Sequence, residues 1–235
     1  MRKLWAILGM VSLVGLTGCE EGIDGNGDRE TETRKYSSFV KVKSDIELDV
    51  EVVQGDQQRV EVTLDSNLID LVQTRVDHET LYITSAYRIG ETVDGPHVRV
   101  TVPTLTAAKL SGSGGMVVRF DQPQLPIDLY VSGSGSLRFD GSAPAVGAFL
   151  SGSGDMRLEG ATSDVELDVS GSGSIRGRGL TAESGSLDLS GSGDISAAVR
   201  ESVEVKLSGS GQIDLYGDAS VDRYDLTGSG DLVQH

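Results

Sequence analysis

Three arginines recur at a fixed interval in the second half of the chain. They are Arg138, Arg157 and Arg176, each 19 residues after the one before. A guanidinium group presents its N–H donors in a planar fork, which suits carboxylate and phosphate groups. If the fold brings the three side chains onto one surface, they form a cationic ladder that could contact an acidic polysaccharide or a similar polyanion.

Nearby acidic residues offer a simpler interpretation of the same ladder. Asp140 lies two residues after Arg138, and a strand would place both on one face. Glu159 has the same relation to Arg157. Exposed ion pairs contribute little to stability and reduce the field of each charge. The sequence therefore favours charge balance over a glycan contact, and both hypotheses stay open.

Two aromatic residues, Tyr130 and Phe149, show the same spacing of 19 residues. Stacked on neighbouring strands, they would form an exposed aromatic pair. Sugar rings and protein partners both use such surfaces, whereas cross-strand aromatic pairs also simply stabilise sheets. Between the two functional readings, the sequence favours a subunit interface over a sugar site.

The remaining chemistry-bearing residues do not form a recognisable site. Aspartates follow Gly-Ser-Gly at Asp155, Asp194 and Asp231, but calcium-binding repeats of this type recur every nine residues. The three histidines are isolated, and no nucleophile elbow, metal-ligand spacing or phosphate loop is present. We expect no catalytic residue, no metal and no cofactor. A net charge of -16 also disfavours nucleic acid as a partner.

A tetrapeptide repeat must position these side chains. Ser-Gly-Ser-Gly begins at six positions, a seventh copy opens with Thr227, and successive copies are 18 to 21 residues apart. The six positions are Ser111, Ser132, Ser151, Ser170, Ser190 and Ser208. A fixed period in this range indicates a stacked repeat architecture, in which each unit buries its apolar face against its neighbours.

Apolar residues alternate on both sides of each tetrapeptide, which predicts strand, turn and strand with one buried face. Four residues of Ser and Gly in each period exclude a helical repeat. The sequence therefore predicts an all-β, single-domain parallel β-helix with coils of about 19 residues, glycine at close-packed corners and serine hydroxyls in a ladder along them. The variable period favours a right-handed coil.

The predicted β-helix domain covers residues 36–235, with the repeats in 105–235. Residues 36–104 are strand-rich without the tetrapeptide and read as an N-terminal cap with the first coils, including a short helix or irregular coil over residues 67–76. No linker separates the two parts. The last repeat carries no polar capping segment, so we expect self-association through that end or along a side.

The first 18 residues read as a signal peptide, with Arg2 and Lys3 before a short apolar run. The run ends in Leu16-Thr17-Gly18-Cys19, which resembles the lipobox of bacterial lipoproteins. That resemblance implies lipidation of Cys19, the single cysteine in the chain. Glu20, rather than Asp, follows the cysteine, which favours the outer membrane. Residues 19–35 are polar and predict a flexible tether that holds the domain roughly 20 Å from the lipid.

The N-terminal strand region and the repeated Ser-Gly-Ser-Gly motifs, such as Ser-Gly-Ser-Gly-Asp-Ile from Ser190, resemble the GIN-domain family, described as auto-transporter adhesin heads. The resemblance covers about Phe39 to Leu232. It implies a parallel β-helix on the bacterial envelope and brings no catalytic residues. The chain lacks the translocator barrel of an auto-transporter, and its lipobox suggests a lipid anchor instead.

These features predict a non-catalytic, lipid-anchored envelope protein that acts as an adhesin or surface-binding module. The expected partners are the membrane through Cys19, a glycan or envelope protein, and a second copy of the chain. A structural scaffold that self-associates is the alternative. A polysaccharide-active enzyme is a third reading, which the uniform coils disfavour because such enzymes carry long loops over one face.

Overall fold

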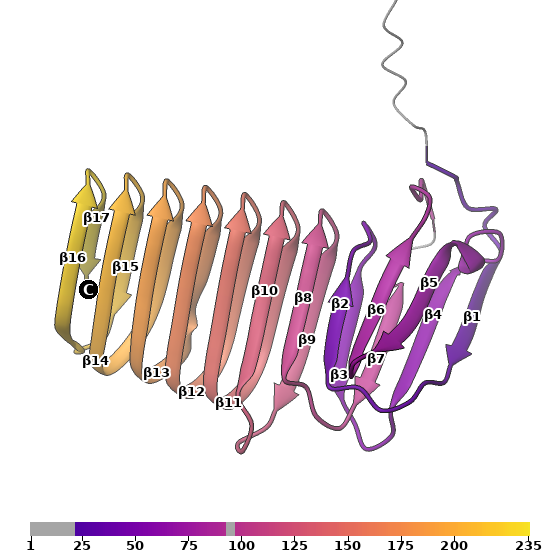
Figure 1. Ribbon diagram of the computed structural model, residues 1–235, viewed down its shortest axis with the longest axis horizontal. Helices are drawn as coiled ribbons and strands as arrows, with labels where there is room; N and C mark the ends of the chain where they lie inside the picture. The colour runs from indigo at the N-terminus through magenta and orange to yellow at the C-terminus, as the bar shows by residue number, and fades with distance from the viewer. Residues whose placement is uncertain (1–21, 93–96) are drawn as a thin grey trace, which may run out of the picture.

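The computed structural model describes residues 22–92 and 97–235, and these residues form a row of stacked β-coils (Figure 1). Each coil of the repeat region consists of two strand runs joined by a Ser-Gly-Ser-Gly corner at one edge and a bend at the other. We call the runs that follow a corner sheet 1 and those that precede a corner sheet 2. The predicted β-helix with coils of about 19 residues is confirmed.

Parallel pairing joins each coil to the next in both sheets. The four longest strands pass through the bend and contribute to both sheets, so that β11 pairs with β9 in sheet 1 and with β10 in sheet 2. The repeat strands are β8 (Ala107–Gly112), β9 (Gly115–Asp121), β10 (Ile127–Gly133), β11 (Ser136–Gly152), β12 (Asp155–Gly171), β13 (Ser174–Gly191), β14 (Asp194–Gly209), β15 (Gln212–Tyr216), β16 (Ser220–Gly228) and β17 (Asp231–Gln234).

The apolar positions of the repeat stack into files inside the coil. In sheet 1 one such file is buried over six successive coils, with every member at most 1% exposed, and it comprises Met116, Leu137, Met156, Ile175, Ile195 and Ile213. Full burial of an aliphatic side chain contributes about 1.5–3 kcal/mol. The buried core continues from Phe39 to Ala219, so one apolar interior supports the repeats and the cap.

The corner explains the repeated glycines. The first glycine of every tetrapeptide has a positive φ between +101° and +132°, which disfavours any residue with a Cβ. These glycines stack in register, as Gly152 does with Gly171. The amide of Ser172 donates a hydrogen bond of 2.9 Å to the Gly152 carbonyl, and other corners repeat this contact. A Cβ on Gly171 would collide with that same carbonyl.

Backbone groups, rather than serine hydroxyls, form the hydrogen-bonded ladder along the corner. Within residues 22–92 and 97–235, no hydrogen bond links the hydroxyls of the repeated serines, so the predicted hydroxyl ladder is not seen. The serine side chains lie on the outer side of the corner, where most are partly or fully exposed. The small residues therefore serve the tight turn rather than a side-chain network.

The cap extends both sheets towards the N-terminus and then ends them with antiparallel strands. Sheet 1 continues from β9 through β3, β7, β4 and β1, and sheet 2 from β8 through β2, β6 and β5. The cap strands are β1 (Arg29–Arg34), β2 (Lys41–Ser44), β3 (Val50–Gln54), β4 (Arg59–Asp65), β5 (Val72–Asp77), β6 (Thr80–Ser85) and β7 (Val98–Val102). Residues 67–76 form a short 3-10 helix (Ile69–Leu71) and the start of β5, so the predicted helix covers only part of this segment.

A flexible tether was predicted over residues 19–35, and the structure corrects this prediction for the described residues 22–35. Residues 29–34 form strand β1, which pairs antiparallel with β4 over six residues. The Arg34 guanidinium donates hydrogen bonds to the carbonyls of Val72 and Ile69 and so holds β1 against the cap. The edge of β4 supplies backbone partners, so a polar segment can join the sheet without burying apolar side chains. The predicted signal peptide and Cys19 lie outside the described residues.

Two corner substitutions can separate the effect of backbone strain on stability from the effect of close contact between coils. A Cβ on Gly112 meets nothing within 4 Å, whereas one on Gly171 meets the Gly152 carbonyl, and both residues have a positive φ. Gly112→Ala should lower the free energy of unfolding by about 1–3 kcal/mol from strain alone. Gly171→Ala should lower it further, as measured by urea unfolding. Equal losses in the two variants would contradict a role for close approach of the coils.

Candidate functional site: an arginine groove on sheet 1

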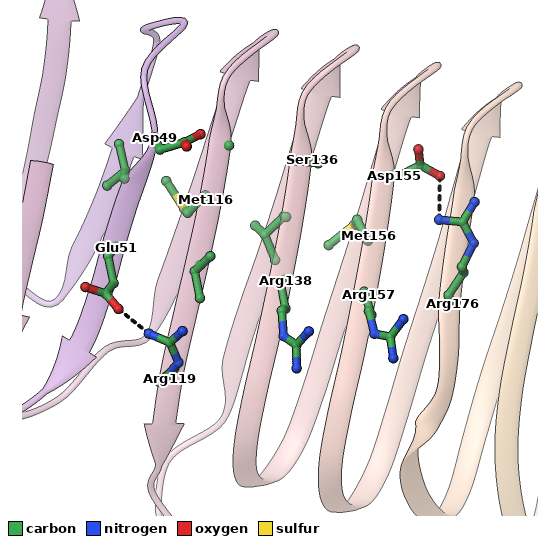
Figure 2. Close-up of a pocket in the computed structure, with 14 residues that line it drawn as sticks. Asp49, Glu51, Met116, Arg119, Ser136, Arg138, Asp155, Met156, Arg157 and Arg176 are labelled. Atoms are coloured by element: carbon green, nitrogen blue, oxygen red, sulfur yellow. Dashed lines mark hydrogen bonds and ion pairs between the residues drawn. The ribbon is translucent and has the colours of Figure 1, made fainter. Parts of the chain in front are cut away.

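The structure brings the three predicted arginines together. Arg138, Arg157 and Arg176 lie in register on β11, β12 and β13, and their side chains extend from the outer face of sheet 1 (Figure 2). Neighbouring strands of a sheet are about 4.8 Å apart. The guanidinium groups therefore form a row that runs across the strands, parallel to the stacking direction of the coils.

Carboxylates of the same face pair with this row. Glu159 accepts a hydrogen bond of 2.6 Å from Arg138 and one of 2.7 Å from Arg157. Hydrogen bonding from Arg157, reinforced by the charge of Arg138, holds the pKa of the Glu159 carboxyl below its ordinary value. Arg176 pairs with Asp155 at 3.0 Å. The predicted charge balance is thus present, with Glu159 in place of Asp140 as the partner of Arg138.

The cap adds a cluster that sequence reasoning did not find. Glu51 on β3 is only 9% exposed and pairs with Arg99 of β7, whose Nε lies 2.8 Å from the carboxylate. Arg119 of β9 contacts the other carboxylate oxygen. Burial raises the pKa of the Glu51 carboxyl, but hydrogen bonds and charge from the two arginines outweigh it and hold the pKa below its ordinary value. Figure 2 shows Glu51 and Arg119 at the cap end of the arginine row.

Small residues open a groove between these clusters. Val117 separates Glu51 from Arg138 in the strand register, and Gly115 lies beside it on β9. The resulting pocket has a volume of about 640 Å³ and reaches from Asp49 to Arg176. We call this surface, with Arg119, Arg138, Arg157 and Arg176 along it, the arginine groove.

A bulge in β13 extends the groove towards the C-terminal coils. The register between β12 and β13 shifts after Arg157, which places Arg178 outside the regular file. Arg178 lines a second pocket of about 460 Å³ that shares Arg157 and Arg176 with the first. Its guanidinium carbon lies 4.2 Å from the ring centre of Tyr216, a cation–π contact. Arg178 does not fall on the 19-residue spacing of the other three arginines, and so the sequence did not predict its place in the groove.

The aromatic pair lies on sheet 2, away from the arginine groove. Tyr130 and Phe149 are in register, with ring centres 4.9 Å apart and planes inclined by 15°. Because the rings face each other, each has one face covered by the other, and the pair does not form a flat sugar platform. This geometry is that of a cross-strand pair that stabilises its sheet, while the predicted subunit interface stays a prediction.

Other features of the described residues add no second centre. In the part of the chain that the structure describes, no group of three or more His, Cys, Asp or Glu side chains is arranged to hold a metal ion. Likewise, no helix there is both long enough and apolar enough to cross a membrane. His78 pairs with Asp77, and His235 pairs with Asp214 and stacks on Tyr216, so these histidines lie in separate surroundings.

Removal of the buried carboxylate should destabilise the cap in a pH-dependent way. Glu51→Gln should lower the free energy of unfolding at pH 7 by about 1.5–3 kcal/mol, the range for hydrogen bonds to charged groups. Since the pKa of Glu51 is lowered on folding, its contribution is complete above the ordinary value of 4.5 and is lost as the pH falls through the lower folded value.

The difference between Glu51→Gln and wild type should therefore shrink in acid, as measured by urea unfolding at several pH values. Glu61→Gln is the matched control, since Glu61 pairs with the exposed Arg59 at 3.5 Å. A pH-independent loss in Glu51→Gln, or an equal loss in the control, would contradict the role given to the buried ion pair.

Solved structures share this fold. The chain resembles a lipid binding protein, named as putative, from Parabacteroides distasonis with a TM-score of 0.73 and 22% identity. A protein named "putative adhesin" from Bacteroides fragilis gives a TM-score of 0.74 and 22% identity. Each alignment covers 91% of this chain and 99% of the other. A protein named "putative adhesin" from Parabacteroides merdae, at 17% identity, gives a TM-score of 0.69.

No curated protein matches the chain at a significant level. A family model does match, and it covers residues 38–219, which include most of the cap, six of the seven tetrapeptide corners and the whole arginine groove. The family is described as "putative auto-transporter adhesin, head GIN domain". The predicted resemblance is thereby confirmed, and the chain belongs to the GIN-domain family.

Proposed function

We propose that this protein is a non-catalytic, lipid-anchored module of the bacterial cell envelope that binds an extended anionic glycan along the arginine groove. The observation that supports this best is the register of Arg138, Arg157 and Arg176 over an open pocket of about 640 Å³. A ligand that follows this row would cross the strands and meet a guanidinium group at each coil.

The arginines keep donors for a ligand although they are ion-paired. The hydrogen bond from Arg138 to Glu159 uses one terminal nitrogen, and that from Arg157 uses Nε. A guanidinium group has five N–H donors, so several remain on each side chain. The side chains of the three arginines are 45% to 60% exposed, which leaves these donors open to the solvent side of the groove.

The charge of the groove differs from that of the whole chain. Among the described residues, five arginines and four carboxylates line its two pockets, whereas the whole chain has a net charge of -16. Long-range attraction of an anionic polymer is therefore absent, and screening confines the favourable field to short range. Recognition would depend on forked hydrogen bonds within the groove rather than on electrostatic steering.

The same contacts argue against catalysis. Glu51, Asp155 and Glu159 are the groove carboxylates engaged by arginine, and the pKa of Glu51 and Glu159 is lowered. A general acid needs a pKa near the working pH. The family description as an adhesin head supports binding instead, and a stacked, uniform coil provides a rigid surface for it.

The lipid anchor rests on the chain's own motif. Leu16-Thr17-Gly18-Cys19 follows a short apolar segment with a basic start. Acylation of the Cys19 sulfur would attach the domain to the envelope, and Glu20 at the next position favours the outer membrane. The adhesin family is consistent with a cell-surface location.

A glycan array tests the proposed groove. Binding of acidic glycans should weaken at least about tenfold in Arg138→Ala/Arg157→Ala/Arg176→Ala, because each lost charged hydrogen bond contributes about 1.5–3 kcal/mol. The control is Arg59→Ala/Arg75→Ala/Arg223→Ala, which removes three ion-paired arginines outside the groove whose side chains are 50% to 66% exposed. Equal binding by wild type and the groove variant would exclude the groove as the site, and no binding by any form would favour a structural scaffold.

One observation favours that scaffold as a second candidate. Leu226 of β16 is 47% exposed, whereas Leu207, its register partner one coil earlier, is 0% exposed. Tyr224 on the same strand is 44% exposed. Apolar surface on a strand that has unpaired edge groups promotes pairing between chains.

Sedimentation velocity of residues 22–235 tests self-association. We expect a concentration-dependent dimer or larger species for wild type, and a shift towards monomer in Leu226→Glu, because a charge cannot enter an apolar contact without a partner. Leu125→Glu is the control, since Leu125 is 39% exposed on a loop of the other end of the repeats. A monomer at all concentrations would exclude the scaffold reading.

A further inference from the structure

The chain is fixed to the cap directly after the predicted lipidation site. The amide of Ile23 donates a hydrogen bond of 2.9 Å to the Arg88 carbonyl, and the amide of Gly90 donates one of 3.0 Å to the Ile23 carbonyl. The amide of Gly25 bonds the Glu91 carbonyl at 2.7 Å. From residue 23 onwards, this segment therefore belongs to the folded cap rather than to a tether.

This attachment limits the distance between the lipid and the domain. Cys19 and Gly22 are three residues apart, and a fully extended chain spans at most about 3.6 Å per residue, or about 11 Å here. The headgroup region on each side of a bilayer is about 5–7 Å thick. An acyl chain on Cys19 would thus hold the cap at the membrane surface, not roughly 20 Å away as the flexible-tether reading required.

Exposed apolar side chains lie at the same place. Ile23 is 41% exposed and Tyr87 is 60% exposed, the largest exposed fraction among the large apolar residues that the structure describes. Arg88 lies between Tyr87 and Ile89, and Ile89 forms an isolated β-bridge with Ile23. The side chain of Arg88 is 61% exposed. Tyrosine and arginine both suit the boundary between headgroups and hydrocarbon, because each combines an apolar body with a polar tip.

We propose that this cap surface, formed by Ile23, Tyr87 and Arg88, docks on the lipid bilayer that holds the acylated Cys19. The proposal rests on the lipid anchor of the proposed function and adds a second, non-covalent contact. Its occupant is a lipid surface because the short covalent link places headgroups within reach of these side chains at a high effective concentration.

The charges around the surface specify which lipids matter. Arg88 pairs with Glu47 at 3.3 Å, and the Asp24 carboxylate accepts a hydrogen bond from the Glu91 amide. Acidic groups thus outnumber the one arginine here, so anionic lipids give no attraction. Docking should occur on zwitterionic phosphatidylcholine and should not strengthen when anionic lipid is added.

A single tryptophan can report the contact. The one tryptophan of the sequence, Trp5, lies in the predicted signal peptide, so Tyr87→Trp gives a mature chain with one tryptophan, which can be excited selectively at wavelengths that tyrosine does not absorb. Lipidated Tyr87→Trp in phosphatidylcholine vesicles should emit at shorter wavelength than in buffer and should be quenched by brominated lipid. Tyr224 lies on β16, a strand at the far end of the coil stack from the cap (Figure 1). Lipidated Tyr224→Trp should therefore show neither change.

Two readouts keep the anchor and the docking distinguishable. Mass spectrometry and co-sedimentation with vesicles report the anchor, and a chain without lipid that stays in solution would overturn both proposals. If lipidated Tyr87→Trp binds vesicles but its emission and quenching equal those of the Tyr224→Trp control, the docking is overturned and the anchor is not. The tryptophan emission of Tyr87→Trp combined with Cys19→Ser should not shift when vesicles are added, because the contact depends on the anchor for its effective concentration.

Discussion

The close approach of backbones at the glycine corner determines the rest of the structure. The first glycine of each tetrapeptide but the last presents its carbonyl to an amide of the following coil, as Gly133 does to Ser153 at 2.9 Å. This contact fixes the register of both sheets at once, because the corner joins them. Every surface file follows from it, including the arginine row, whose members are aligned only because their corners are aligned.

Stacking in register also restricts which charges the outer faces can carry. Like charges in one file face each other across about 4.8 Å and repel. In the arginine row, Glu159 lies between two guanidinium groups and offsets this repulsion. On sheet 2, burial and the neighbouring Asp188 raise the pKa of Asp168, while Lys206 pairs with Asp188 at 2.7 Å. Charged files are therefore tolerated where a counter-charge is built in.

The repeat region could be predicted from the sequence because one local rule governs each coil. Glycine spacing and alternate apolar residues predicted the corners, the buried files and the alignment of Arg138 with Arg157 and Arg176. The cap follows no such period, and so the pairing of Glu51 with Arg119 depends on a contact between residues 68 positions apart. Strand β1 was missed for a related reason, since backbone pairing at an edge requires no apolar pattern.

Because the corners are uniform, the number of coils can change during evolution one whole coil at a time. Each coil of the repeat region pairs its backbone with the coil on either side through the same corner geometry, so a tandem duplication or an in-frame deletion of one coil leaves compatible backbone edges on both sides. Such an event between β11 and β13 would lengthen or shorten the arginine row by one guanidinium group while leaving the cap unchanged. Descendants of this chain could therefore carry arginine rows of different length by gene recombination alone, without a new way of packing the core.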